Sequence, residues 1–301
     1  MAELLLIPVC ILTGALLNRI KAVPDNSYKV INAVIIYVTL PAFTLLYIPQ
    51  IKINIELIFP ALVAWIAFIL SVVFFAISGK FYKWDKSTTG SLILTCGLAN
   101  TAFVGFPVLM ALYGEEGLKL GVIIDQAGSF LVLSTLGIAA ASIYSSGTFS
   151  VKKITIDILT YPSFIAFILS VIMIAAGINH NENSASILSA IGKPTIILAL
   201  ISVGMQLKPK IDKLLWKELA SGLFYKLIAA PAVIFVLYFY LFKLKGLVFQ
   251  VSLIESAMPP MIMGSVLAVQ FNLNPRLSNL LVGIGIPVSA VTLAMWYWLI
   301  K

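Results

Sequence analysis

The stretch Ile254-Glu255-Ser256-Ala257-Met258-Pro259-Pro260-Met261-Ile262-Met263-Gly264 breaks two rules of membrane helices at once. Proline lacks a backbone N–H and clashes with the preceding turn, so Pro259 and Pro260 should interrupt the helix that the apolar run 247–271 predicts. An ionisable side chain at bilayer depth costs about 2.5–3.5 kcal/mol on insertion scales, so Glu255 needs a partner or a task there. We therefore expect a broken helix that forms part of a site.

The composition of the chain indicates a membrane protein. Hydrophobic residues make up 61% of its 301 residues and charged residues only 11%, whereas soluble domains carry about 25% charged residues. We predict an all-α, multi-pass protein with about ten transmembrane helices and no sizeable soluble domain. The predicted spans are 4–19, 29–48, 56–79, 90–113, 119–144, 155–178, 187–207, 216–242, 247–271 and 277–300.

Basic residues lie in the short connections between these spans and are concentrated in the odd-numbered connections. Because basic connections stay in the cytoplasm, both termini are expected outside the cell. The spread of positive charge over many short connections also argues against a nucleic-acid surface. The lipid bilayer is the expected partner of most of the surface.

Ten spans with both ends on one side allow two inverted five-helix repeats, residues 1–150 and 151–301, within a single membrane domain. The fourth span of the first half runs from Ala99 to Pro107 through Asn100, Thr101 and Gly105, so it is interrupted by polar residues, glycine and proline as span nine is. Such paired interruptions indicate the binding site of a transporter. We expect spans four and nine to cross near mid-membrane.

Helix breaks are predicted at Pro41, Pro107 and Pro259. The polar and helix-breaking residues that we place around the crossing are Asn100, Thr101, Asp125, Gln126, Gln206, Glu255, Pro259 and Pro260. A half-helix N-terminus and amide donors favour an anionic substrate, whereas Glu255, Asn100 and exposed carbonyls favour a cation.

Structural alternatives remain open for these residues. Asn100 can cap backbone groups that the break leaves free, and Glu255 can be the ion-pair partner of Lys226. Asp125 can lie at the membrane surface. Motifs of nucleophilic catalysis, phosphate binding and metal ligation are not found, so we expect neither an enzyme nor a cofactor.

Several short motifs occur in a fixed order along nearly the full chain: Leu40-Pro41, Ala99-Asn100-Thr101-Ala102-Phe103-Val104-Gly105-Phe106-Pro107 with Tyr113-Gly114, Gly204-Met205-Gln206-Leu207, Lys226 with Pro231, Met258-Pro259-Pro260 and Asn272-Leu273-Asn274-Pro275. With these motifs the sequence resembles the auxin efflux carrier family, which includes plant carriers and bacterial relatives described as malate permeases. Two positions depart from the pattern of the plant carriers. Ala99 stands where those carriers have a crossover proline, and Glu255 stands where they have a neutral residue.

The resemblance implies a scaffold domain and a transport domain in which the broken spans cross. It places substrate beside the crossing, with Asn100 and Pro259 at the crossing and Gln126 on the substrate side. Thr101 and Pro260 are their neighbours in the predicted substrate site. Glu255, with Asn100 and Asp125, is the predicted site of a coupling ion, either H⁺ or Na⁺.

We therefore expect a secondary active carrier in a prokaryotic plasma membrane that moves small organic anions, such as dicarboxylates or auxin-like acids, by an elevator-type motion. A homodimer is an assembly that the sequence allows. The alternatives are a passive channel and a membrane sensor that binds a ligand without moving it.

Overall fold

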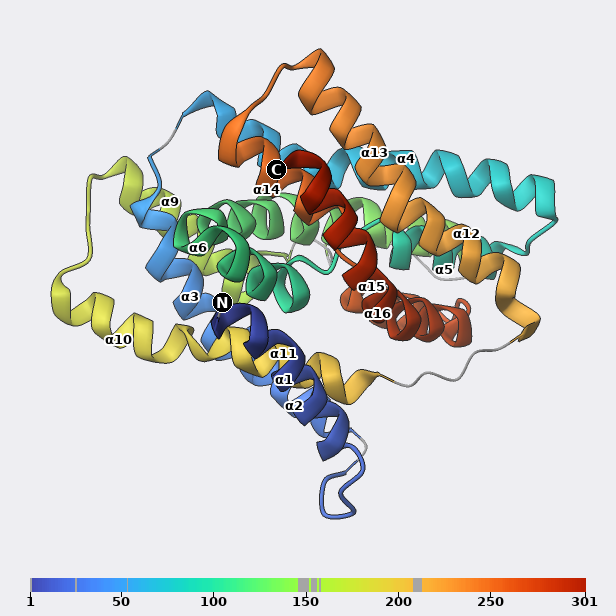
Figure 1. The fold of residues 1–301 in the computed structure, drawn as a ribbon, viewed down its shortest axis with the longest axis horizontal. Helices are drawn as coiled ribbons and strands as arrows, with labels where there is room; N and C mark the ends of the chain where they lie inside the picture. The colour runs from blue at the N-terminus through green and yellow to red at the C-terminus, as the bar shows by residue number, and fades with distance from the viewer. Residues whose placement is uncertain are drawn as a thin grey trace.

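The computed structural model describes residues 2–24, 26–52, 54–145, 152, 156, 158–207 and 213–301. Its described part is helical, with one isolated antiparallel bridge and no longer strand. The α-helices in Figure 1 are α1 (Ala2–Leu17), α2 (Ser27–Val34), α3 (Leu40–Tyr47), α4 (Ile58–Tyr82), α5 (Lys86–Cys96), α6 (Phe106–Ile123), α7 (Ile138–Tyr144), α9 (Pro162–Ala175), α10 (Glu182–Gly192), α11 (Pro194–Gln206), α12 (Trp216–Phe224), α13 (Ala230–Phe235), α14 (Gly246–Ser256), α15 (Ile262–Gln270) and α16 (Pro275–Ile300).

The chain is a multi-pass, all-helical membrane protein. In the described part of the chain, six helical stretches are long and apolar enough to cross a membrane: Ser27–Gln50, Ile55–Tyr82, Thr101–Tyr144, Glu182–Gln206, Trp216–Leu241 and Pro275–Ile300. Leu5–Leu17, Pro162–Ala175 and Gly246–Ser256 are shorter apolar helices.

The helix boundaries differ from the predicted ones at spans four, five and nine. Predicted spans four and nine are each split into two helices, and the helical path from span four continues into span five through a bend at Gly114, whose φ is +64°. The expected boundary between the repeats, at residues 150 and 151, lies outside the described residues. The count of ten spans and the inverted repeats stay predictions.

Several helices widen into π-helical segments directly before a proline. The segments η1 (Ile35–Thr39), η4 (Thr101–Gly105) and η8 (Tyr225–Ala229) are each followed by an α-helix with proline as its second residue. A proline cannot donate to the carbonyl four residues earlier, and a widened turn accommodates that missing bond. The helical path therefore passes Pro41 and Pro107, which the sequence marked as breaks, whereas Pro259 lies in the gap between α14 and α15.

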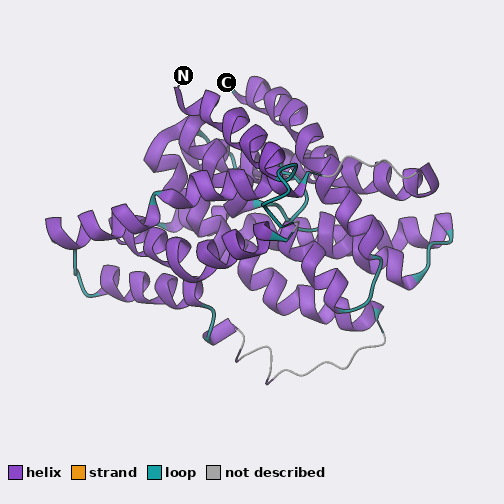
Figure 2. Ribbon diagram, turned by 90° about the horizontal axis from the view of Figure 1, so that it is seen from below, coloured by secondary structure: helices purple, strands orange, loops and turns teal. Residues whose placement is uncertain are grey.

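The two interrupted helices occupy the interior. Every residue from 88 to 107 and from 251 to 262 is buried. In Figure 1, α1 and α11 lie on one side of this central group, and α4 and α13 lie on the other. Both chain ends lie on the same face of the molecule in Figure 2.

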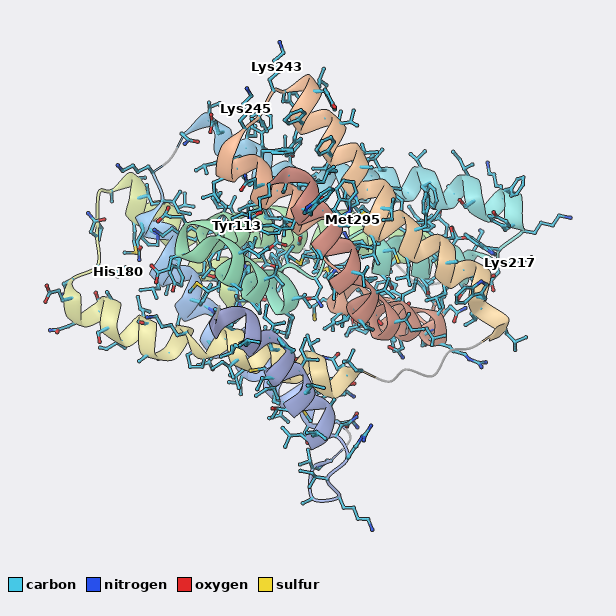
Figure 3. All side chains as sticks on the ribbon, viewed as in Figure 1. Tyr113, His180, Lys217, Lys243, Lys245 and Met295 are labelled. Carbon is cyan, nitrogen blue, oxygen red and sulfur yellow. The ribbon has the colours of Figure 1, made fainter. Side chains whose placement is uncertain are left out.

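Charged side chains mostly avoid this interior. Figure 3 places Lys217, Lys243 and Lys245 at the periphery, near the ends of helices. Lys226 is the contrast, because it lies within the helical stretch Trp216–Leu241 and is only 1% exposed.

Helices α1 and α11 pack at backbone distance through two glycines. A Cβ atom at Gly204 would lie 2.1 Å from the carbonyl oxygen of Ile11, and one at Gly14 would lie 2.1 Å from that of Ile201. Small residues at helix interfaces in membranes allow such approach. The pair fixes α11 against α1 beside the central group.

Substituting Gly204→Ala is expected to destabilise the protein by about 1–3 kcal/mol, the usual range for overpacking, because the added methyl meets backbone and not a flexible side chain. Unfolding in detergent measures the change. Gly137→Ala is the matched control, since its Cβ would lie 3.3 Å from the movable side-chain end of Leu133 and 3.5 Å from the nearest backbone atom, the carbonyl oxygen of Val132. Equal stability of both variants would contradict the packing described.

Candidate functional site at the crossing of two broken helices

The gaps of the two interrupted helices lie side by side and hold each other. The first gap, 97–100, follows α5, and the second, 257–261, follows α14. The N–H of Asn100 donates to the carbonyl of Pro259 at 2.9 Å, and the N–H of Met261 donates to the carbonyl of Thr95 at 3.0 Å. Ala99 and Pro260 form the antiparallel bridge. Backbone groups that would otherwise be unpaired at this depth therefore bond each other, as a membrane interior requires.

The crossing needs glycine because the two chains approach so closely. A Cβ atom at Gly264, in the first turn of α15, would lie 2.1 Å from the carbonyl oxygen of Leu94 in α5. This contact brings the N-terminal turn of one half-helix against the C-terminal part of the other. The sequence signal for the crossing therefore includes Gly264 as well as the prolines.

Four of the predicted site residues lie together beside the crossing: Asn100, Thr101, Asp125 and Gln126. The hydroxyl of Thr101 donates to Asp125 Oδ1 at 2.5 Å, and the amide nitrogen of Gln126 donates to Asp125 Oδ2 at 2.7 Å. Each carboxylate oxygen of Asp125 thus has a donor, which offsets part of the cost of burying it. Asp125 is 6% exposed, so its carboxylate is buried inside the protein and is not solvated.

Two amide atoms of this cluster have unused hydrogen-bonding capacity. Asn100 Nδ2 and Gln126 Oε1 are buried without a partner among the described residues. The orientation of the Gln126 amide follows from chemistry, because only its nitrogen can donate to Asp125. The cluster therefore presents one free donor and one free acceptor. Buried polar groups rarely stay unpaired, so this pair is a candidate ligand contact.

A cavity of about 210 Å³, here called the inner cavity, adjoins these side chains. Its polar and aromatic lining consists of Asn100, Thr101, Asp125, Gln126, Ser134, Gln270, Phe103, Phe130 and Tyr161. The remaining lining is aliphatic or Met, including Leu133, Ile138 and Val266. The inner cavity thus combines a small polar cluster with a larger apolar wall, the usual composition of a small-molecule site.

The helical segments that follow both gaps begin at the inner cavity. Asn100 and Thr101 open the segment η4–α6, and Met261, Ile262 and Met263 open α15, and all five line the cavity. The unpaired N–H groups at a helix N-terminus carry partial positive charge and attract anions. Two such ends converge on one small cavity.

A larger cavity of about 780 Å³, here called the outer cavity, adjoins the inner one and shares Ile36, Ile262, Met263 and Val266 with it. Its polar lining consists of Asn26, Tyr28, Lys29, Asn32, Tyr37, Gln206, Ser265, Arg276 and Asn279. Among the described residues of this lining, the charged side chains are the basic ones of Lys29 and Arg276. An anion approaching the inner cavity from this side would meet positive charge first.

Gln206 belongs to the outer cavity and not to the polar cluster at the crossing. Its amide nitrogen donates to the carbonyl and the hydroxyl of Ser202, both at 3.1 Å, and that hydroxyl donates to Asn32 Oδ1 at 2.5 Å. This chain of bonds links α11 to α2 along the wall of the outer cavity.

Glu255, Pro259 and Pro260 line neither cavity. The prolines supply the backbone of the crossing. Glu255 is fully buried on α14 and faces Gly105: an ideal Cβ built on Gly105 would lie 2.4 Å from Glu255 Oε1. The predicted ion-coupling residues are therefore divided, since Asn100 and Asp125 line the inner cavity while Glu255 does not.

Sequence reasoning missed the outer cavity and the aromatic wall of the inner one. We interpreted Lys29 and Arg276 only as topology signals, and nothing in their local sequence separates a cavity-lining base from a loop base. Tyr161 stacks on Phe130 with ring centroids 4.2 Å apart, and both line the inner cavity. Tyr161 directly precedes Pro162, the first residue of α9, and this position was the weak indication in the sequence that Tyr161 lies at a helix start.

Substituting Thr101→Val is expected to destabilise the protein by about 1.5–3 kcal/mol, the usual value of a hydrogen bond to a charged group, because Asp125 Oδ1 loses its donor. Thr101→Ser keeps the hydroxyl and should retain most of the stability. Chemical unfolding in detergent compares the two variants. A valine variant as stable as the serine variant would show that this hydrogen bond contributes nothing to the free energy of unfolding.

Comparison with known proteins places the chain in a family. A family described as "Membrane transport protein" matches residues 1–297. The chain therefore belongs to this family of membrane transporters, the auxin efflux carrier family that its motifs resemble.

Named relatives agree with the family. An uncharacterized transporter of Methanocaldococcus jannaschii is 27% identical over 309 residues, covering 100% of this chain and 98% of the relative. One of Methanothermobacter thermautotrophicus is 26% identical, covering 96% of this chain and 94% of the relative. The uncharacterized transporter YfdV of Escherichia coli is 24% identical, covering 98% and 96%. The family and these names point to a transporter rather than an enzyme.

Proposed function

We propose that this protein is a secondary active carrier of small organic anions in the plasma membrane of a prokaryote, with both termini outside. The observation that carries the proposal is the convergence of two half-helix N-termini on the inner cavity, next to the unpartnered amide of Asn100. In this proposal Asn100 donates to the substrate carboxylate, and Gln126 and Thr101 complete the polar end of the site.

The basic lining of the outer cavity supports an anion over a cation. Lys29 and Arg276 would raise the local concentration of an anion at the entrance to the inner cavity. Asp125 is the opposing charge in the inner cavity, and the hydrogen bonds that both of its oxygens accept offset only part of its repulsion of an anion. In the proposal, Asp125 orients the side chains of Thr101 and Gln126 and forms part of the site of the coupling ion.

The lining of the inner cavity favours an acid with an apolar body. Phe130, Tyr161 and Leu133 give the inner cavity an apolar wall, and Ser134 and Gln270 are its polar lining residues outside the cluster of Asn100, Thr101, Asp125 and Gln126. A dicarboxylate would place its second carboxylate against this wall and lose hydration there. An auxin-like acid, with one carboxylate and one aromatic body, is the better match.

An elevator-type motion is the proposed mechanism. The crossing of α5–α6 with α14–α15 forms one hydrogen-bonded body that can move as a unit against helices such as α1 and α11. Lys29 and Arg276 lie in the first turns of α2 and α16, next to connections that the distribution of basic residues assigns to the cytoplasm, so the described conformation opens inward in this proposal. A coupling ion, H⁺ or Na⁺, would bind near Glu255.

A thermal-shift screen of the purified protein tests the proposal. The panel contains indole-3-acetate, benzoate, malate and succinate, with choline as a cation control, each at two pH values and with or without Na⁺. A ligand that binds only the folded state raises the melting temperature as its concentration passes its dissociation constant. We expect stabilisation by the aromatic acids. Stabilisation by choline alone would contradict an anion site.

A further inference from the structure

Glu255 is a buried carboxyl group that the substrate site does not use. It is the last residue but one of α14, it is 0% exposed, and both of its carboxyl oxygens are buried without a hydrogen-bond partner among the described residues. A carboxylate in that position would have neither water nor a donor to stabilise its charge.

The packing around Glu255 is tight and offers few polar atoms. An ideal Cβ at Gly105 would lie 2.4 Å from Oε1 and 2.7 Å from Oε2, so the carboxyl group fills the space that a side chain at position 105 would occupy. A Cβ at Gly121 would lie 3.4 Å from Oε1, with Leu109 and Phe106 carbons as its other neighbours. Two glycines and apolar side chains thus surround the carboxyl group.

The charged groups that interact electrostatically with Glu255 are Lys226 on η8 and Asp125 on the π-helical segment η5 (Ile124–Phe130). Lys226 Nζ donates to the carbonyl of Ser256 at 2.7 Å, one residue from Glu255. Lys226 and Glu255 do not form an ion pair closer than 4.0 Å. In the described part of the chain such a pair is formed by Lys119 and Glu116. The ammonium group caps the C-terminal end of α14, where its charge is favourable, and the ion pair with Glu255 that the sequence left open as a structural alternative is not formed.

A Na⁺ ion needs several oxygen ligands, and the surroundings of Glu255 do not supply them. Three backbone carbonyls at and after the end of α14 already accept hydrogen bonds: that of Glu255 from Met258, that of Ser256 from Lys226, and that of Pro259 from Asn100. Clusters of three or more acidic, His or Cys side chains do not occur in the described part of the chain. A proton needs only the carboxyl group itself.

We propose that Glu255 is a proton-binding site and that the coupling ion is H⁺, not Na⁺. The carboxyl group carries the proton in the described conformation. When the crossing moves and water reaches the site, the O–H bond of Glu255 breaks, the proton passes to water, and the Lys226 ammonium turns from the Ser256 carbonyl to the new carboxylate. The coupling part of this inference rests on the proposed carrier function, whereas the protonation part does not.

Infrared spectroscopy of the purified protein at pH 7 tests protonation without any substrate. We expect the C=O stretching band of a buried protonated carboxylic acid in the wild type and its loss in Glu255→Gln. Glutamine is isosteric with the protonated acid, so the variant should fold with a similar melting temperature. Glu182→Gln, which alters an exposed glutamate on α10, is the control and should keep the band. A band that is absent from the wild type or unchanged in Glu255→Gln overturns the proposal.

Two further measurements decide the ion and the coupling. NaCl and KCl at equal concentration should give the wild type the same melting temperature, and stabilisation by Na⁺ in the wild type but not in Glu255→Gln overturns the choice of H⁺. For an acid that the protein transports, a pH gradient should accelerate uptake by the wild type, and Glu255→Gln should lose this acceleration fully. Gradient-driven uptake that persists in the variant overturns the coupling. Failure to transport any acid counts against the carrier function, while the infrared band still decides protonation.

Discussion

Substituting Asn100→Ala is expected to reduce substrate affinity roughly 10–150-fold, the equivalent of a lost hydrogen bond to a charged group at about 1.5–3 kcal/mol. Asn100 Nδ2 is a buried donor without a protein partner and lies at the N-terminus of the segment η4–α6, beside the inner cavity. The backbone N–H of residue 100, which bonds Pro259, is retained in the variant. The crossing should therefore persist while the contact with the carboxylate is lost.

The measurement is a titration of thermal stabilisation by the aromatic acid that binds the wild type. Asn183→Ala, on the exposed side of α10, is the control and should bind as the wild type does. Unchanged affinity in Asn100→Ala would mean that Asn100 only caps the broken helix, the structural alternative that the sequence left open.

Substituting Gly264→Ala is expected to weaken both stability and transport. The new methyl would lie 2.1 Å from the carbonyl oxygen of Leu94, which is backbone of α5 and cannot turn away as a side chain can. Moving it disturbs the adjacent bond from Met261 to the carbonyl of Thr95. Overpacking of this kind costs about 1–3 kcal/mol and occasionally more, and it acts directly on the crossing that forms the site.

Unfolding in detergent and uptake into proteoliposomes measure the two effects of Gly264→Ala. Gly137→Ala again serves as the matched control, because both glycines lie within helical segments, and a Cβ at Gly137 would come no closer than 3.5 Å to a backbone atom, against 2.1 Å at Gly264. A Gly264 variant that matches the Gly137 variant in both measurements would contradict the close crossing of α5 and α15.

The sequence was sufficient to predict the broken helix at Pro259 and its counterpart around Asn100. Two consecutive prolines in the middle of an apolar run interrupt a helix, because each lacks a backbone N–H and clashes with the preceding turn. Asn100-Thr101 with Gly105 indicates the corresponding interruption in span four. The position of the first break was less predictable. Pro107 is the visible helix breaker there, yet the gap lies upstream at 97–100, because the π-helical turn of η4 accommodates that proline.

The grouping of the site residues depends on packing that sequence does not encode locally. Asp125 and Thr101 are far apart in the chain, and their contact arises only because η4 and η5 lie together. The same holds for Lys226: charge alone favoured pairing with Glu255, but the nearer acceptor is the carbonyl at the C-terminal end of α14. Tyr161 lines the inner cavity, where its ring stacks on that of Phe130, and no sequence motif predicts this contact.

Counterflow in proteoliposomes tests the central claim, that this crossing carries a small organic anion by alternating access. Vesicles loaded with unlabelled indole-3-acetate are diluted into a trace of the labelled acid, with protein-free vesicles to subtract passive permeation. We predict transient, saturable accumulation of label by the wild type and its loss in Asn100→Ala. Flux that does not saturate, or that is unaffected by acid on the opposite side, would contradict a carrier and indicate a passive channel.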